Sequence, residues 1–280
     1  MNALEIKNLT KRFNDFCLDS LDLTLPGGCI MGLIGENGAG KSTTIKLILD
    51  ILKKDGGTIT VLGRDSGDNM HLTREDIGVV FDEPAFPLCL TAKQIGRVMA
   101  LTFRNWDERG YADLLRRFGL PDNKEFKDFS RGMKMKLSIA VALSHKARLL
   151  LLDEPTSGLD PVVRDEIVDM LYAFARDEEH SILISSHIVS DLEKLCDYIA
   201  FLHRGKLLIC DEKDKLLEQY ALVRCSRDQA KELPADKLRY KKQTAYYVDA
   251  LMLREDIPAA FESVPVTIEE LFLFMVKEGE

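Results

Sequence analysis

The chain has 280 residues, of which 46% are hydrophobic and 30% charged, and its formal net charge is −8 at pH 7. Such a composition is typical of a globular protein long enough for one large domain and a smaller one. The acidic balance argues against a nucleic-acid binder held mainly by phosphate contacts, although a local basic patch is not excluded, and no apolar run approaches the roughly 18 residues needed to cross a bilayer.

The first third of the chain predicts strands around one glycine-rich turn. The N-terminus has no signal-peptide core. Residues 3–9 and 21–28 predict two strands of an antiparallel sheet, the second closed by a Pro-Gly-Gly turn. Residues 29–35 predict a short apolar strand that runs through a glycine-rich turn into a helix at 41–52. Further strands are expected at 57–63 and 77–81.

The middle of the chain changes character. Strand signals vanish from about residue 84 to 146, and amphipathic stretches predict a helical insertion there. Strands predicted at 149–153 and 181–186 then alternate with helices at 161–177 and 190–196, and a hairpin follows at 198–210. This alternation implies a mostly parallel core sheet. From about residue 211 the pattern weakens to short mixed elements and an apolar-faced helix at 267–279, which predicts a small C-terminal appendage.

The glycine-rich turn GENGAGKST, at 35–43, fits the pattern G-x-x-x-x-G-K-[ST]. Glycines let the backbone curl so that consecutive N–H groups point at phosphate oxygens, and the following helix adds its positive N-terminus. Lys41 is expected to reach the terminal phosphates and the Ser42 hydroxyl to ligate Mg²⁺. The motif predicts a nucleoside triphosphate site formed by Gly35, Glu36, Asn37, Gly38, Ala39, Gly40, Lys41, Ser42 and Thr43.

The choice of base depends on weaker signals. The chain lacks the Asn-Lys-x-Asp segment with which GTPases typically read guanine. An adenine needs little more than a stacking platform, and Phe13 is a candidate because an aromatic ring offers a face to any base. The alternatives are that Phe13 packs in the core, or that the nearby Phe16 stacks instead.

The tripeptide Asp-Glu-Pro occurs twice, at 82–84 and at 153–155, each time after an apolar run that predicts a buried strand. A carboxylate pair at the end of a buried strand often holds a metal or activates water. The residues alone do not decide which pair does so.

Two further segments carry a family resemblance. FSRGMKMKLSIAVALSHKARLLLLDEPTSGLDP begins at Phe129, and ILISSH ends at His187. Together with the phosphate-binding turn, and in this order, they resemble the ATP-binding cassette of ABC transporters over about residues 4–210. The resemblance implies an α/β fold with a P-loop NTPase core, an antiparallel β subdomain, a helical insertion and a small C-terminal α+β appendage. The expected domains are an ABC ATPase domain at 1–210, with its helical subdomain at about 84–146, and an accessory region at 211–280.

The resemblance assigns roles by position. Asp153 resembles the Walker B aspartate that holds Mg²⁺ through water, and Glu154 resembles the catalytic base that orients the attacking water. His187 resembles the switch histidine, which helps to hold Glu154 and the water. Lys41 completes the implied catalytic set, and Asp160 resembles the residue that links two nucleotide sites across a dimer.

The segment 129–133 resembles the family signature Leu-Ser-Gly-Gly-Gln, supplied to ATP across the dimer. It keeps Ser130 and Gly132 and departs at Phe129, Arg131 and Met133. The resemblance implies a trans-acting site formed by Ser130, Arg131, Gly132 and Met133. An alternative is that Ser130 is simply the N-cap of the next helix, and both readings can hold.

Asp82 stands where the family usually has a glutamine that senses Mg²⁺ and the γ-phosphate. A carboxylate also offers an oxygen to the metal, so the metal site is expected to include Ser42, Asp82 and Asp153. The alternative is that Asp82 turns outward before Pro84. In the apolar loop that follows, Phe86, Leu88 and Leu90 are expected either to contact a membrane subunit or to pack within the helical subdomain.

The resemblance thus implies an ATPase subunit that binds ATP and Mg²⁺ and forms a homodimer or heterodimer beneath an integral membrane permease, at the cytoplasmic face of the cell membrane. The tail at 267–279 resembles exporter-type subunits and favours a peptide, drug or lipid-like cargo. Two alternatives are a soluble ABC ATPase acting on ribosomes or nucleic acid, and a non-catalytic regulatory cassette. Six cysteines without a Cys-x-x-Cys pair predict reduced packing residues of a cytosolic protein.

Overall fold

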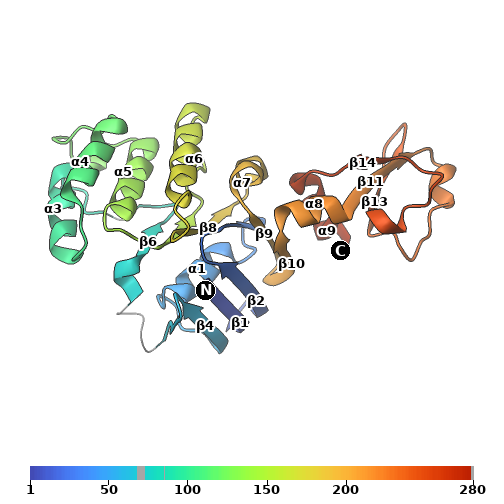
Figure 1. Ribbon diagram of the computed structural model, residues 1–280, viewed down its shortest axis with the longest axis horizontal. Coiled ribbons are helices and arrows are strands. Elements are labelled where there is room, and N and C mark those ends of the chain that lie inside the picture. Colours follow the sequence, from blue (N-terminus) through green and yellow to red (C-terminus); the bar gives the residue numbers. More distant parts are fainter. Residues whose placement is uncertain (68–72, 85, 279–280) are drawn as a thin grey trace.

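The computed structural model describes residues 1–67, 73–84 and 86–278. Position 85 of the predicted helical insertion lies outside these ranges, as do positions 279 and 280 of the predicted C-terminal region. Figure 1 shows an elongated molecule with a helical group at one end, a two-sheet body in the middle and a third sheet at the other end. No helix in the described ranges is both long and apolar enough to span a bilayer.

The N-terminal sheet is antiparallel and has the strand order β2-β1-β4-β5. The first two predicted strands pair as expected, with Ile6 opposite Leu23, and the strand predicted at 57–63 joins the other edge of β1, with Ile6 opposite Ile59. The strands are β1 (Asn2–Arg12), β2 (Cys17–Pro26), β4 (Gly56–Val61) and β5 (Arg64–Asp65).

The central sheet carries the nucleotide site and has the order β10-β9-β3-β8-β7-β6. Its neighbours are parallel except for the antiparallel hairpin β9–β10, which confirms the mostly parallel core that strand–helix alternation predicted. The strands are β3 (Ile30–Ile34), β6 (Ile77–Val80), β7 (Leu149–Asp153), β8 (Ser181–Ser186), β9 (Tyr198–His203) and β10 (Lys206–Glu212).

Strand β7 shows why its sequence is a continuous apolar run. Successive side chains of a strand point to opposite faces, and both faces of this sheet are covered. Leu149 and Leu151 join the apolar cluster beneath the N-terminal sheet and α1 (Lys41–Ile48). Leu150 and Leu152 join the cluster under the helices of the other face. The strand therefore holds its polar end, Asp153, rigidly between two cores.

The helical segment between β6 and β7 contains α3 (Ala92–Thr102), α4 (Glu108–Arg117) and α5 (Arg131–Leu143). Its helices begin at polar caps: Thr91 and Gln94 form a reciprocal capping box, and Asp107 accepts a hydrogen bond from Gly110 N. Helices α6 (Pro161–Ala175) and α7 (Val189–Leu195) follow β7 and β8 and lie on the same side as α5 (Figure 1). Short 3-10 turns lie at Arg74–Asp76, Phe126–Asp128, Gln229–Lys231 and Arg254–Asp256.

The C-terminal region forms a third, antiparallel sheet of order β12-β13-β11-β14 with two helices. Helix α9 packs this region onto the body, because Phe272 contacts Phe201 of β9 with ring centroids 5.3 Å apart. One continuous apolar cluster includes both residues. The elements are α8 (Lys213–Gln219), β11 (Tyr220–Cys225), β12 (Tyr240–Gln243), β13 (Val248–Leu253), β14 (Ser263–Pro265) and α9 (Ile268–Glu278).

Candidate nucleotide site

A cavity of about 630 Å³ opens at the carboxyl end of β3, above the N-terminus of α1. Its position follows the general rule that open α/β sheets bind ligands beyond the carboxyl ends of their strands. Most of the predicted phosphate-binding turn reaches its wall, together with residues from three other segments. The wall comprises Phe13, Asp15, Phe16, Glu36, Asn37, Gly38, Gly40, Lys41, Ser42, Thr43, Asp82 and Glu154.

The turn needs glycine for two different reasons, the first of which applies both to Gly38, with a φ of 83°, and to Gly40. Gly40 has a φ of 113°, a backbone conformation that other residues rarely adopt. Gly35 has no such requirement, but a side chain there would lie 2.5 Å from the carbonyl oxygen of Leu202. Gly35 and Ala39 are outside the cavity wall and hold the turn against β9, so their contribution is to shape the loop.

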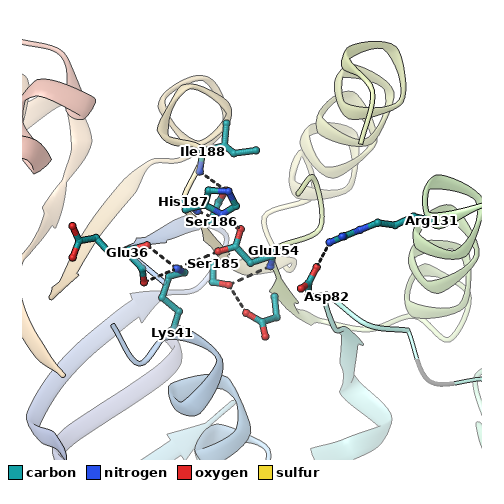
Figure 2. A network of polar contacts seen from close by, with 11 residues as sticks. Glu36, Lys41, Asp82, Arg131, Glu154, Ser185, Ser186, His187 and Ile188 are labelled. Carbon is teal, nitrogen blue, oxygen red and sulfur yellow. Dashed lines mark hydrogen bonds and ion pairs between the residues drawn. The ribbon is translucent and has the colours of Figure 1, made fainter. Parts of the chain in front are cut away.

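Lys41 is buried, and its ammonium group contacts three acceptors of its own chain. Its Nζ donates hydrogen bonds to Gly35 O at 2.6 Å and to Glu36 O at 3.2 Å, and it lies 3.2 Å from Glu154 Oε1 (Figure 2). An ammonium group has three donors. An arriving phosphate would therefore have to replace one of these contacts, and the ion pair with Glu154 is the one that a stronger anion can displace.

Glu154 lies between Lys41 and His187. Its Oε2 is 2.7 Å from His187 Nδ1 and accepts a longer hydrogen bond from His187 N at 3.3 Å. The backbone of Glu154 has a φ of 52°, in the left-handed region, and its N–H donates to Ser185 O. The side chain is thus aimed into the cavity from a strand end, with a cation on one oxygen and an imidazole on the other. This is the arrangement expected of a general base with an orienting partner.

Ser185 was missed by the sequence analysis. Strands β7 and β8 pair so that Asp153 lies opposite Ser185, whose Oγ donates a 2.6 Å hydrogen bond to Asp153 Oδ1. The same Oγ accepts a 3.3 Å hydrogen bond from Glu154 N. A serine at the carboxyl end of a strand just before His187 was the available signal, but only the strand register connects it to Asp153.

Ser185→Ala is expected to lower the rate of ATP hydrolysis about tenfold, because Asp153 loses a buried hydrogen bond to a charged group and Glu154 N loses one of its two acceptors. Steady-state phosphate release at saturating ATP measures this. Ser181→Ala is the control, since Ser181 is equally buried at the other end of β8. Equal rates for the two variants would contradict the assignment.

Phe13 and Phe16 lie on the nucleotide cavity's rim. Phe13 is 44% exposed and its ring centroid is 6.2 Å from that of the half-buried Phe16. This exposure argues against the core-packing alternative for Phe13 and leaves its face available to a base. Both rings reach the cavity, so the choice between them as the stacking surface stays a prediction.

The signature segment lies outside the cavity of its own chain. Ser130 is the N-cap of α5 and accepts a 3.3 Å hydrogen bond from Met133 N, which is the structural alternative considered for it. Asp160 likewise caps α6 through Val163 N. Gly132 has room around it, with no atom closer than 3.7 Å to the position of a side-chain carbon. Trans-acting roles for these residues stay predictions.

Asp82 reaches the cavity wall, but its carboxylate is bound by another predicted site residue. Arg131 Nη2 lies 2.5 Å from Asp82 Oδ1, in an ion pair that joins the end of β6 to the start of α5 (Figure 2). A metal ion would have to compete with this guanidinium for Asp82. Metal ligation by Asp82 stays a prediction, and the ion pair is a partner that the sequence analysis did not anticipate.

The phosphate turn, the buried lysine and the strand-end carboxylates together define a P-loop ATPase. The family described as "ABC transporter" matches residues 18–157. The bacitracin transport ATP-binding protein BcrA of Enterococcus faecalis is 35% identical over 209 residues, covering 74% of this chain and 68% of that protein. The ABC transporter ATP-binding protein YtrB of Bacillus subtilis is 28% identical over 283 residues, covering 96% and 97%.

A solved structure of an ATP-binding subunit of an ABC transporter is 30% identical and superimposes with a TM-score of 0.68, covering 78% of this chain and 92% of that one. The chain belongs to the ABC transporter family, as an ATP-hydrolysing, ATP-binding subunit. The family resemblance and the fold class inferred from the sequence are thereby confirmed. The domain boundaries at 210 and at 84–146 stay predictions.

Proposed function

We propose that two copies of this chain close around two ATP molecules and drive a separate integral membrane permease of an export system. The cluster formed by Lys41, Glu154 and His187 carries the proposal, because it joins a buried cation and a buried base to an exposed orienting imidazole in one network of contacts. ATP supplies charge contacts to both faces of such a dimer, so nucleotide binding would favour closure.

The residues fit a role in which substrate binding releases the base. Lys41 contacts Glu154 directly, and a terminal phosphate would draw its ammonium group away. Glu154 would then remain hydrogen-bonded to His187, free to accept a proton from a water that attacks the γ-phosphate. Binding of ATP would thus activate Glu154, because Lys41 would exchange its contact with Glu154 for a contact with the phosphate.

The donor chemistry near Asp153 fits Mg²⁺. Asp153 is 4% exposed, and no cationic side chain among residues 1–67, 73–84 and 86–278 forms an ion pair with it. A buried carboxylate without a cation is well suited to a metal, and Mg²⁺ prefers oxygen ligands. Ser42 and Asp153 would hold the ion, with Asp82 as the further predicted ligand. When bound, the metal neutralises charge on the phosphates.

The proposed permease contact lies on the helical side of the chain. Leu88 is 60% exposed, whereas Phe86 packs edge-on against Phe126, with centroids 5.5 Å apart, and Leu90 is half-buried. Of the three loop residues considered for this contact, Leu88 is therefore the one that remains available. The same helical segment has a cavity of about 730 Å³ between α3 and α4, whose lining includes the 91%-exposed Leu101.

The proposed cargo is a peptide, drug or lipid-like molecule, and the proposed location is the cytoplasmic face of the cell membrane. Similarity to BcrA, a bacitracin transport ATP-binding protein, supports this class. The C-terminal helix α9, which follows the exporter-like pattern in the sequence, is packed onto the body of the subunit. The proposal includes no nucleic-acid partner.

The test is to tag this chain in its native host, extract membranes with detergent and identify what co-purifies in stoichiometric amount. We expect a hydrophobic permease, and we expect the pair in proteoliposomes to move a peptide or lipid-like compound only with ATP. Recovery of ribosomes or nucleic acid instead would favour the soluble alternative. A purified chain with no steady ATP turnover would favour a regulatory cassette.

A further inference from the structure

The wall of the nucleotide cavity is unexpectedly acidic for a site that binds a triphosphate. It contains a single basic residue, Lys41, and four carboxylates among the described residues: Asp15, Glu36, Asp82 and Glu154. Like charges repel, and although water and salt weaken the repulsion from the exposed side chains, these carboxylates oppose the phosphates unless they are compensated. Cationic side chains near the carboxylates would therefore help this cavity to bind its ligand.

Three of the four carboxylates lie within 4.0 Å of a nitrogen of a lysine, an arginine or a histidine side chain. Glu36 Oε2 is 3.5 Å from His203 Nδ1, and Glu154 contacts Lys41 and His187. Asp82 has Arg131, which comes from a different part of the fold, the start of α5. The described part of the chain offers Asp15 no ion-pair partner.

Arg131 is held in this position by more than one contact. Its guanidinium lies against Gly158, where a side-chain carbon would be 3.2 Å from both Cζ and Nη1. Gly158 has a φ of 66° and belongs to the turn that follows Glu154. The arginine of the signature segment therefore extends back over its own chain's catalytic turn to reach Asp82 (Figure 2).

Resting on the proposed function, we infer that Arg131 acts in cis: it neutralises Asp82 and so permits its own chain's cavity to bind the terminal phosphate of ATP. Arg131 compensates the charge of Asp82 by direct contact, and Lys41, not Arg131, contacts the nucleotide bound in the same chain. This role is separate from any contact that Arg131 makes with a nucleotide of a second copy. The pair Asp82–Arg131 acts as one electrostatic unit, because each charge matters chiefly through the other.

The experiment is a double-mutant cycle on nucleotide affinity. Arg131→Gln, Asp82→Asn and the double variant are compared with the unmodified chain by competition of ATP and of ADP against a fluorescent nucleotide. Measurements at low protein concentration in EDTA prevent hydrolysis and ATP-driven pairing, and they remove any effect of Asp82 as a metal ligand. Arg116→Gln is the control, since Arg116 forms a comparable exposed ion pair with Asp113 on α4.

We expect Arg131→Gln to weaken ATP affinity about fivefold and ADP affinity less than about twofold, because the uncompensated Asp82 repels the terminal phosphate most. Asp82→Asn should bind ATP at least as tightly as the unmodified chain. The double variant should return to within about twofold of Asp82→Asn, and the effect of Arg131→Gln should shrink as salt rises.

If Arg131→Gln costs the same ATP affinity whether residue 82 is the native aspartate or carries the Asp82→Asn substitution, the inference is overturned, since Arg131 would then act on the phosphate directly. No loss on Arg131→Gln would overturn it as well. Unchanged ADP affinity and circular dichroism exclude misfolding as the cause of a loss. An unmodified chain that fails to bind ATP would instead contradict the proposed function.

Discussion

Glu154→Gln is expected to reduce steady ATP hydrolysis by at least about 100-fold while leaving ATP affinity nearly unchanged. The amide keeps the shape of the side chain but cannot accept the proton of the attacking water, and loss of a general base typically costs this much or more. The substitution also removes the ion pair with Lys41, which frees the ammonium group for phosphate. Dimers closed around unhydrolysed ATP should therefore accumulate.

Phosphate release, equilibrium ATP binding and size-exclusion chromatography with ATP measure these three effects. The control is Glu83→Gln, because Glu83 occupies the same place in the other Asp-Glu-Pro tripeptide but is exposed and outside the cavity wall. Its hydrolysis rate should stay within about twofold of the unmodified chain. Rapid turnover by Glu154→Gln would show that another group serves as the base.

Phe272→Ala is expected to lower the free energy of unfolding by about 3 kcal/mol. Phe272 is 8% exposed and lies against Phe201 of the central sheet, so truncation leaves a void between the C-terminal helix and the body. The loss should appear both in the circular dichroism of the whole chain and in the fluorescence of Trp106, because one apolar cluster includes Phe272 and packs against Trp106.

Leu273→Ala is the matched control, since Leu273 is the next residue of α9 and is 47% exposed. Its effect on the unfolding free energy should stay within about 0.5 kcal/mol. Urea denaturation of both variants, followed by the two signals, makes the comparison. If Phe272→Ala costs no more than Leu273→Ala, or alters only one signal, the C-terminal region unfolds as a unit separate from the body.

The parts of the site that were predictable are those encoded by contiguous residues. The turn at 35–43 and the apolar strand before Asp153 each contain their own physical reason: glycine where the backbone must curl, and leucine where both faces of a strand are buried. The alternation of strands and helices was equally local, and it was enough to predict a parallel central sheet.

The parts that were not predictable depend on how distant segments meet. The hydrogen bond between Asp153 and Ser185 needs the register of β7 against β8, and a one-residue shift would remove it. The pair Asp82–Arg131 joins residues 49 positions apart, through packing of α5 against β6. Attachment of the C-terminal region through Phe201 and Phe272 likewise depends on tertiary contact alone.

The left-handed backbone at Glu154 has a further consequence. A non-glycine residue in this region stores strain of about 1 kcal/mol or more, which the surrounding structure must offset. Of the seven non-glycine residues with positive φ in the described chain, Glu154 alone lines the nucleotide cavity. At this strand end, folding stability and catalysis favour different residues: glycine would relax the backbone, and only a carboxylate supplies the base. The enzyme is therefore less stable to unfolding than it would be with glycine at position 154, the residue on which its turnover depends.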